Sequence, residues 1–296
     1  MINKLLVIVG PTASGKTGLS IKLAKNFNGE IVSADSRQVY KGMDIGTGKI
    51  TQKEMQGVPH YLLNIVSPKT RFDVAKYRKK ALKTIKYIQK RNKLPILIGG
   101  TGFYIQAVVD DIVFPKVKPD WKLRSLLEKK DAKFLFKELN RLDPQRAEII
   151  DKNNKRRLIR AIEIVKKTNK PVPPLKKNKP QFKILMIGIK KEKKELISLI
   201  KKRLLKRLKN GMLAEVKKLR KSGLSWKRLE EFGLEYRYIA QYLQKKITKE
   251  EMIEKLQKEI EHYAKRQMAW FKKDKRIRWI KNYSQAKKIS KNFINK

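Results

Sequence analysis

Short apolar runs rich in branched residues alternate with helical patterns over the first third of the chain. Four of these runs are typical of strands, namely KLLVIVG, EIVSAD, HYLLNIV and LPILIGG. A fifth, FKILMIGI over 182–189, follows a stretch of short, highly charged helical patterns. Apolar strands that alternate with helices are typical of a parallel sheet. The pattern therefore predicts an α/β fold, with a parallel sheet core flanked by helices.

The return of a strand after a helical stretch indicates an inserted small helical domain. We expect the insertion over residues 116–179, with 1–115 and 180–296 forming the catalytic core and its C-terminal helices. Apolar residues from 196 to 216 recur every four positions, which predicts one long amphipathic helix. EEMIEKLQKEIEHYAKRQMAWFKK predicts a second long helix, and the final SQAKKISKNFINK has the composition of a basic tail.

The chain is strongly basic, and this charge has two interpretations. Its 296 residues include 75 Lys and Arg against 27 Asp and Glu, a formal net charge of +48. Such a surface attracts a polyanion, with nucleic acid the first candidate. Free use of Lys, Ile and Asn throughout the chain also fits a compositional bias of the genome. Local motifs have to decide between the two.

Composition excludes several other classes of protein. The absence of cysteine excludes disulfide frameworks and Cys-based zinc sites, and the two histidines, His60 and His262, are too few for a His-rich metal site. No apolar run approaches the length that spans a membrane, and the first apolar run lacks the cleavage site of a signal peptide. We expect a soluble, cytoplasmic protein that is a monomer.

A phosphate loop directly follows the first apolar run. The segment GPTASGKT has the spacing G-x-x-x-x-G-K-[ST] and opens a helical pattern. In such loops the backbone N–H groups surround the phosphates, the lysine (Lys16) reaches the terminal phosphates, and the hydroxyl (Thr17) holds Mg²⁺. The core is therefore a P-loop core, but the loop alone does not say whose phosphates it binds.

Two polar side chains follow other predicted strands. Asp35 comes after EIVSA, and Thr101 comes after LPILIGG. The carboxyl ends of parallel strands share one edge of a sheet, so both should lie near the phosphates. Each alone fits an ordinary turn or loop residue, whereas together they indicate a site. LPILIGG ends without the acidic residue that holds Mg²⁺ in many nucleotidases and helicases, which argues against a helicase.

Seven motifs, in order over nearly the whole chain, resemble the tRNA dimethylallyltransferase family. They are GPTASGKT, SADSRQVYKGMDIGTGK, GGTGFYI, DPQRAEII, RRLIRAIEI, GMLAEV and YAKRQMAWF. The resemblance implies transfer of a dimethylallyl group from dimethylallyl diphosphate to the exocyclic amine of an adenosine beside the anticodon of tRNA. The loop would then hold the donor's diphosphate with Mg²⁺. The residues implied to bind it are Gly10, Pro11, Thr12, Ala13, Ser14, Gly15, Lys16 and Thr17.

The resemblance also assigns roles in the reaction. Asp35 is the implied general base, because a carboxylate can accept the proton of the weakly nucleophilic amine. Lys16 and Arg203 would stabilise the charge on the leaving diphosphate, and Thr101 would contact the base or the donor. Arg203 also fits a solvated face of a helix with many lysines.

Residues implied to bind the anticodon stem-loop of tRNA lie at five places in the chain. They are Asp35, Ser36, Arg37, Gln38, Thr101, Arg124, Arg156, Arg157, Leu158, Ile159, Arg160, Lys265, Arg266 and Gln267. The arginines of RRLIR are suited to phosphate contacts, although a merely solvated basic face fits them as well. GLEYR departs from the commoner Gly-Tyr form of the family at Glu235 and Tyr236.

Three alternative functions remain. A small-molecule kinase with a P-loop would not need a large basic insertion. An adenylate isopentenyltransferase would perform the same chemistry on a free nucleotide, against which RRLIR and the charge argue. A non-catalytic RNA-binding protein with a relict phosphate loop would not need an intact Lys16, Thr17 and Asp35.

Overall fold

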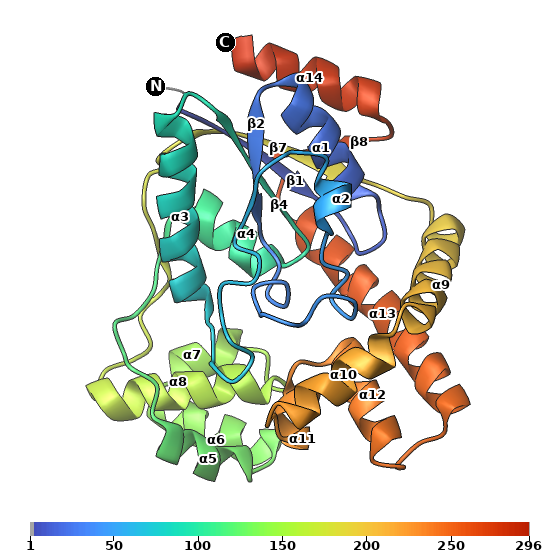
Figure 1. Cartoon of the computed structure of the whole chain (residues 1–296). Coiled ribbons are helices and arrows are strands. Elements are labelled where there is room, and N and C mark those ends of the chain that lie inside the picture. The colour runs from blue at the N-terminus through green and yellow to red at the C-terminus, as the bar shows by residue number, and fades with distance from the viewer. Residues whose placement is uncertain (1–2, 296) are drawn as a thin grey trace. The chain divides into compact units, whose positions relative to one another are not determined.

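A six-stranded parallel sheet forms the centre of the protein (Figure 1). The computed structural model describes residues 3–295. The order across the sheet is β3-β2-β4-β1-β7-β8, and every pairing within it is parallel. The strands are β1 (Lys4–Val9), β2 (Gly29–Ser33), β3 (His60–Tyr61), β4 (Leu94–Gly99), β7 (Lys183–Ile189) and β8 (Ile277–Ile280). The predicted α/β fold with a parallel sheet core is confirmed.

Helices cover both faces of this sheet. Successive strand residues point to opposite faces, and both sets are apolar, so both faces must be buried. On one face, α3 (Val74–Lys90) and α4 (Gly102–Val109) pack on alternate residues of β1, including Leu5 and Val7. On the other face, α1 (Lys16–Asn26) and α14 (Tyr283–Asn295) pack on the intervening residues, including Leu6. The sheet is therefore buried on both faces, and the edge formed by the carboxyl ends of its strands is left for a site.

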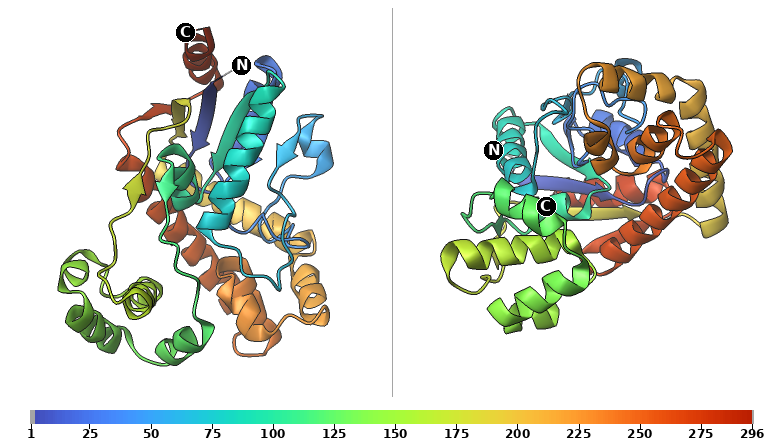
Figure 2. Two further views of the ribbon diagram at one scale, coloured as in Figure 1. Left: turned by 90° about the vertical axis from the view of Figure 1, so that its left-hand side faces the viewer. Right: turned by 90° about the horizontal axis from the view of Figure 1, so that it is seen from below.

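A second core is built from helices later in the chain. These helices are α9 (Lys193–Lys209), α10 (Met212–Lys221), α11 (Trp226–Glu231), α12 (Leu234–Leu243) and α13 (Lys249–Lys272), grouped side by side in Figure 2. Their apolar faces enclose Val39, Tyr40 and Met43 from the segment after β2. This segment also carries the short α2 (Gln52–Met55). The helical core therefore packs directly on a loop that begins at the carboxyl edge of the sheet.

The structure corrects four local predictions. The expected helix over 196–216 is two helices, because Gly211 adopts φ +95° between α9 and α10. The final basic segment is an ordered helix, α14, with Ala286 and Ser290 buried. HYLLNIV contributes only two residues of strand, since Leu62 and Asn64 adopt positive φ. Strand β8 was not expected from its alternating basic and apolar sequence.

The chain divides into two compact units. The first comprises the residues up to Asp111 and those from Lys179 onward, and the second is Ile112–Asn178. The elements of the second unit are β5 (Ile112–Val113), α5 (Trp121–Glu128), α6 (Ala132–Leu142), α7 (Pro144–Ile149), α8 (Lys155–Thr168) and β6 (Lys176–Lys177). Its helices enclose a separate apolar core around Leu135, Leu139 and Leu158. Strands β5 and β6 pair antiparallel where the chain enters and leaves this unit.

Candidate active site

The phosphate loop joins β1 to the N-terminus of α1. Gly10 and Gly15 adopt φ +151° and +88°, and Ala13 adopts φ +60°. Gly15 is the N-cap of α1, and no side chain caps the helix there. The first backbone N–H groups of a helix carry partial positive charge and bind anions when they lack a cap. Ser14 Oγ is also buried without a hydrogen-bond partner among the described residues. The loop is thus built to receive an anion.

The GGTG segment follows β4 and lies beside the phosphate loop. A Cβ on Gly99 would lie 2.1 Å from Ala34 O, and one on Gly100 would lie 2.2 Å from Gln267 Nε2. A Cβ on Gly102 would lie 2.3 Å from Trp270 Cδ1. These glycines are required because the segment after β2 and helix α13 pack directly against the backbone.

Asp35 and Thr101 lie together at this edge, as the order of the strands requires. Thr101 Oγ1 accepts a hydrogen bond from Ser36 N at 3.1 Å. Asp35 Oδ1 accepts from Arg37 N at 2.8 Å and from Gln38 N at 3.2 Å. Asp35 is therefore a turn residue, the simpler interpretation of its sequence context. Its Oδ2 atom makes no hydrogen bond to any described residue.

A cavity at the edge of the sheet is lined by three of the four predicted catalytic residues, Lys16, Asp35 and Arg203, whereas Thr101 does not line it. Helix α13 contributes Tyr263, and burial followed by the Asp35 carboxylate raises the pKa of Tyr263 to about 12. The residues that line the cavity are Thr12, Lys16, Thr17, Ser20, Ile31, Ser33, Asp35, Gln38, Thr47, Gly48, Ile50, His60, Leu63, Ile98, Gly99, Gly100, Arg203, Tyr263 and Gln267.

Two basic side chains, Lys16 and Arg203, line this cavity. Burial and the Arg203 guanidinium lower the pKa of Lys16 to about 7, against a smaller opposite effect of Asp35. Burial and Arg207 lower the pKa of Arg203 to about 10. Lys16 Nζ donates to Pro11 O at 2.6 Å, and Arg203 Nη2 donates to Gly48 O at 3.4 Å. Both side chains contact backbone carbonyls rather than carboxylates, and a bound anion would favour the charged form of each.

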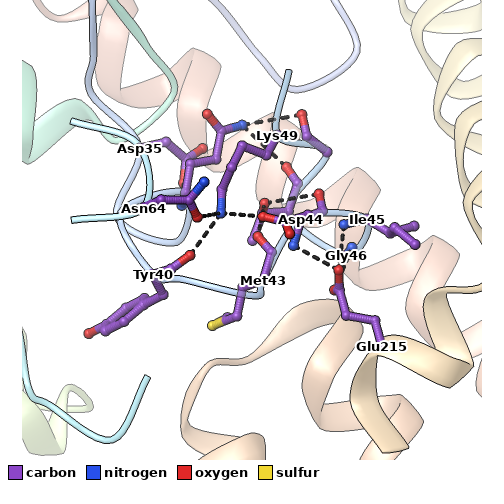
Figure 3. Close-up of polar contacts among 12 residues, drawn as sticks. Asp35, Tyr40, Met43, Asp44, Ile45, Gly46, Lys49, Asn64 and Glu215 are labelled. Carbon is purple, nitrogen blue, oxygen red and sulfur yellow. Dashed lines mark hydrogen bonds and ion pairs between the residues drawn. The ribbon is translucent and has the colours of Figure 1, made fainter. Parts of the chain in front are cut away.

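The loop that contains Gly48 is fixed by a buried lysine (Figure 3). Lys49 Nζ donates to Tyr40 O at 2.8 Å, Asp44 Oδ1 at 2.6 Å and Asn64 Oδ1 at 2.6 Å. Burial lowers the pKa of Lys49, while the hydrogen bond to Asp44 raises it. All three protons of the ammonium group are therefore used inside the protein, and Lys49 is structural.

Gln267 makes two hydrogen bonds that its sequence context did not predict. Its Oε1 accepts from Thr12 N at 2.8 Å, and its Nε2 donates to Gly100 O at 2.9 Å. The side chain is buried and connects the phosphate loop to the GGTG segment. Gln267 also lines the cavity, and its expected tRNA contact stays a prediction. Its neighbours Lys265 and Arg266 are exposed, and Arg266 pairs with Glu259 at 2.7 Å.

Within the second unit, two of the predicted arginines are tied to one buried carboxylate. Arg124 donates from Nε and Nη2 to the two oxygens of Glu163, at 2.8 and 2.7 Å. Arg160 Nη1 also bonds Glu163, and its Nη2 donates to Val117 O at 3.0 Å. The Glu163 side chain is 0% exposed, and Asp120 N donates to it as well, at 2.6 Å. This cluster holds α5, α8 and the segment before α5 together.

The remaining predicted residues of α8 separate into buried and exposed positions. Leu158 and Ile159 lie in the apolar core of the unit, at 0% and 6% exposure. The prediction of tRNA contacts is wrong for these two side chains. They lie on the face of α8 that packs into the apolar core, whereas Arg156 and Arg157 lie on the opposite, exposed face.

No set of three or more His, Asp or Glu side chains within residues 3–295 gathers in a way that could hold a metal ion. Thr17, the predicted metal ligand, also lines the cavity.

Sequence patterns did not point to several residues of the site. Gly48, Arg207 and Tyr263 were missed, since each acts through contacts with distant parts of the chain. Glu215 lies within GMLAEV, a motif with no predicted role, and it bonds the loop around Gly46. Gly48 lies within SADSRQVYKGMDIGTGK and Tyr263 begins YAKRQMAWF, so these two motifs and GMLAEV were the available signals.

Within the described chain, no helix is long and apolar enough to cross a membrane.

The parallel sheet and the loop at its carboxyl edge define a P-loop protein. The family model described as IPP transferase matches residues 38–274. The chain is 41% identical to the tRNA dimethylallyltransferase of Carboxydothermus hydrogenoformans, over 99% of this chain and 97% of that protein. It is 40% identical to the tRNA dimethylallyltransferase of Halothermothrix orenii, over 98% and 93%.

Solved structures agree with these matches. The crystal structure of the full-length tRNA isopentenylpyrophosphate transferase from Bacillus halodurans has a TM-score of 0.75 and 37% identity, covering 99% of this chain and 96% of that one. A eukaryotic dimethylallyltransferase described as acting on tRNA has a TM-score of 0.79 and 28% identity, covering 99% and 80%. The chain belongs to the IPP transferase family, and the resemblance found in its sequence is confirmed.

Proposed function

We propose that this protein transfers a dimethylallyl group from dimethylallyl diphosphate to the exocyclic amine of the adenosine 3′-adjacent to the anticodon of tRNA. The observation that carries the proposal is the single cavity in which an anion-binding loop, Lys16 and Arg203 meet the Asp35 carboxylate. The relatives named tRNA dimethylallyltransferase support it over nearly the full length of the chain. The phosphate loop then holds the diphosphate of the donor. The alternative function of a small-molecule kinase is not favoured.

Asp35 is the proposed general base. The amine nitrogen attacks the first carbon of the dimethylallyl group, the bond from that carbon to the diphosphate oxygen breaks, and the amine loses a proton. Two backbone N–H groups orient Asp35 through Oδ1, so its Oδ2 can accept that proton. Thr101, which is hydrogen-bonded to Ser36 N, is proposed to contact the base or the donor.

Lys16 and Arg203 are proposed to stabilise the departing diphosphate. Negative charge grows on that group as the carbon–oxygen bond breaks, and preorganised donors in a partly dry cavity stabilise it strongly. The uncapped first turn of α1 adds backbone N–H groups. The metal that assists a diphosphate substrate is proposed to be Mg²⁺, held by the Thr17 hydroxyl and by substrate oxygens, where it would neutralise charge on the diphosphate.

The second unit is proposed to bind tRNA through the exposed face of α8. Arg156 and Arg157 would contact phosphates, for which the guanidinium group is well suited. Arg124 and Arg160 are proposed to support that face through Glu163. The exposed residues Lys265 and Arg266 of α13, together with Ser36, Arg37 and Gln38 near the cavity, are proposed as further tRNA contacts.

Modification of tRNA in vitro tests the function. The protein is incubated with Mg²⁺, unmodified tRNA and either dimethylallyl diphosphate or ATP, and the tRNA is digested for mass analysis of its nucleosides. We expect one adenosine to gain a five-carbon prenyl group with dimethylallyl diphosphate, and no nucleotide hydrolysis with ATP. ATP turnover without a prenylated nucleoside would support the kinase instead.

A further inference from the structure

Loop 44–48 forms one wall of the catalytic cavity. Thr47 and Gly48 line the cavity, and the side-chain amide of Gln38 donates to their carbonyl oxygens at 3.4 and 3.3 Å. Gly48 adopts φ +58°, and a Cβ there would lie 2.2 Å from Arg203 Nη2 and 1.7 Å from Arg207 Nη2. The two guanidinium groups therefore rest on the backbone of Gly48, and the place of Arg203 depends on the place of this loop.

One carboxylate outside the cavity holds the loop (Figure 3). Glu215, on α10, accepts hydrogen bonds from Asp44 N at 2.7 Å, Ile45 N at 2.6 Å and Gly46 N at 3.0 Å. Tyr236 Oη also donates to it, at 2.8 Å. Three consecutive N–H groups and a hydroxyl converge on the two oxygens of a single ion, and bonds of this kind are stronger than neutral ones.

Glu235 and Tyr236, two neighbouring residues of α12, also hold loop 44–48. Tyr236 packs so closely on the loop that a Cβ on Gly46 would lie 2.8 Å from its ring. Glu235 pairs with Arg207 at 2.9 Å, and Arg207 Nη1 also donates to Gly46 O at 3.1 Å. Glu235 and Tyr236 of α12 therefore contribute to the position of the loop, together with Glu215 of α10.

We propose that Glu215 is a positioning residue, which fixes loop 44–48 so that Arg203 and the Gln38 amide face the cavity in the geometry needed for transfer. This proposal rests on the proposed function, because Arg203 is assigned there to the leaving diphosphate. Glu215 itself does not line the cavity and so does not touch the substrate. Its effect passes through the backbone of Gly46 and Gly48.

The variant Glu215→Gln tests the proposal, because it keeps the size of the side chain and turns an oxygen acceptor into a donor that opposes the backbone N–H groups. A shift of about 1 Å in a catalytic group can cost about 10²-fold in rate. We expect the single-turnover rate per folded molecule to fall about 10²-fold, with tRNA affinity within twofold of the parent. Glu215→Asp, which keeps the carboxylate, should recover part of the rate.

The matched control is Glu254→Gln, an exposed side chain of α13 that pairs with Lys258. It should leave the rate unchanged. Hydrogen exchange gives a readout that is independent of activity, in which the amides of residues 44–46 should exchange faster in Glu215→Gln than in the parent or the control. A folded Glu215→Gln protein with the parent's rate, or with unchanged exchange at these amides, overturns the proposal. A parent protein that transfers no prenyl group contradicts the proposed function instead.

Discussion

The two units use arginines in opposite ways. In the second unit, Arg124 and Arg160 share the buried carboxylate of Glu163, which balances one of their two positive charges within the fold. At the cavity of the first unit, Arg203 contacts Gly48 O and has no carboxylate partner among residues 3–295, and burial lowers its pKa to about 10. An arginine whose charge is left uncompensated at a cavity is suited to an anionic ligand, whereas one paired with a buried carboxylate supports the fold.

The largest effect expected at the cavity concerns Asp35. Asp35→Asn keeps the shape of the side chain and removes the acceptor charge, so single-turnover transfer should fall by about 10²–10⁴-fold. Donor affinity should change little, since Lys16 and the loop amides hold the diphosphate. Rates, donor affinity and Tm are measured on the same preparation. A normal transfer rate would remove Asp35 from the mechanism, and a lower Tm with normal turnover would leave it as a turn residue alone.

On the other side of the comparison, Glu163→Gln should destabilise the second unit. The change leaves Arg124 and Arg160 without their anionic partner, which we expect to cost about 2–3 kcal/mol. The cost is measured by denaturant unfolding together with hydrogen exchange of the α8 amides. The transfer rate of folded molecules at saturating tRNA should stay near that of the parent. Unchanged protection of α8 would show that the cluster does not support the fold.

The same cluster predicts a dependence of stability on pH. Burial acts to raise the pKa of Glu163, but hydrogen bonds from Arg124, Asp120 N and Arg160 lower it below its ordinary value of 4.5. Its stabilising effect is therefore complete above the unfolded-state pKa and is lost as pH falls through the lower folded-state pKa. The difference in unfolding free energy between the parent and Glu163→Gln should shrink as pH drops below about 4.5. A difference that stays constant to lower pH contradicts the lowered pKa.

A smaller effect is expected at the exposed face of α8. Binding of tRNA releases counterions, so affinity should fall steeply with salt. Replacing Arg156 and Arg157 by Ala should weaken binding and reduce the slope of log affinity against log salt by about 2. Donor affinity should be unchanged. The control pair is Lys287→Ala with Lys288→Ala on α14, which removes the same charge elsewhere. Equal slopes for the two double variants would mean that the α8 face is only solvated.

Much of the cavity could be predicted because its parts lie at strand ends. The phosphate loop has a fixed spacing, and Asp35 and Thr101 follow strands whose carboxyl ends share one edge of the sheet. The hydrogen bonds of Gln267 to Thr12 N and Gly100 O could not be predicted, because a helix exposes or buries a residue according to its neighbours, which YAKRQMAWF does not reveal. The contact of Arg203 with Gly48 joins residues 155 positions apart, and no local pattern encodes it.

The elements show the same limit. The spacing of four from 196 to 216 continues through the break at Gly211, so periodicity alone predicted one helix. Strand β8 pairs only with β7 and is too short and too basic to stand out in the sequence. On α8, the sequence placed the arginines outward in general terms. The sequence did not show that Arg160 pairs with Glu163 while Arg156 stays exposed. That difference depends on the packing of α5, whose Arg124 also bonds Glu163.

The most direct test compares Arg203→Ala with Arg124→Ala in one experiment. Single-turnover transfer and Tm are measured for both variants and the parent. We expect Arg203→Ala to lose about 10²–10³-fold in rate, the typical effect of removing one donor to a developing anion, with a Tm near that of the parent. Arg124→Ala should lower the Tm and keep the rate per folded molecule at saturating tRNA. Arg203→Ala with the parent's rate, or Arg124→Ala with the parent's Tm and a slower rate, would contradict the division of the two arginines into ligand-binding and fold-supporting roles.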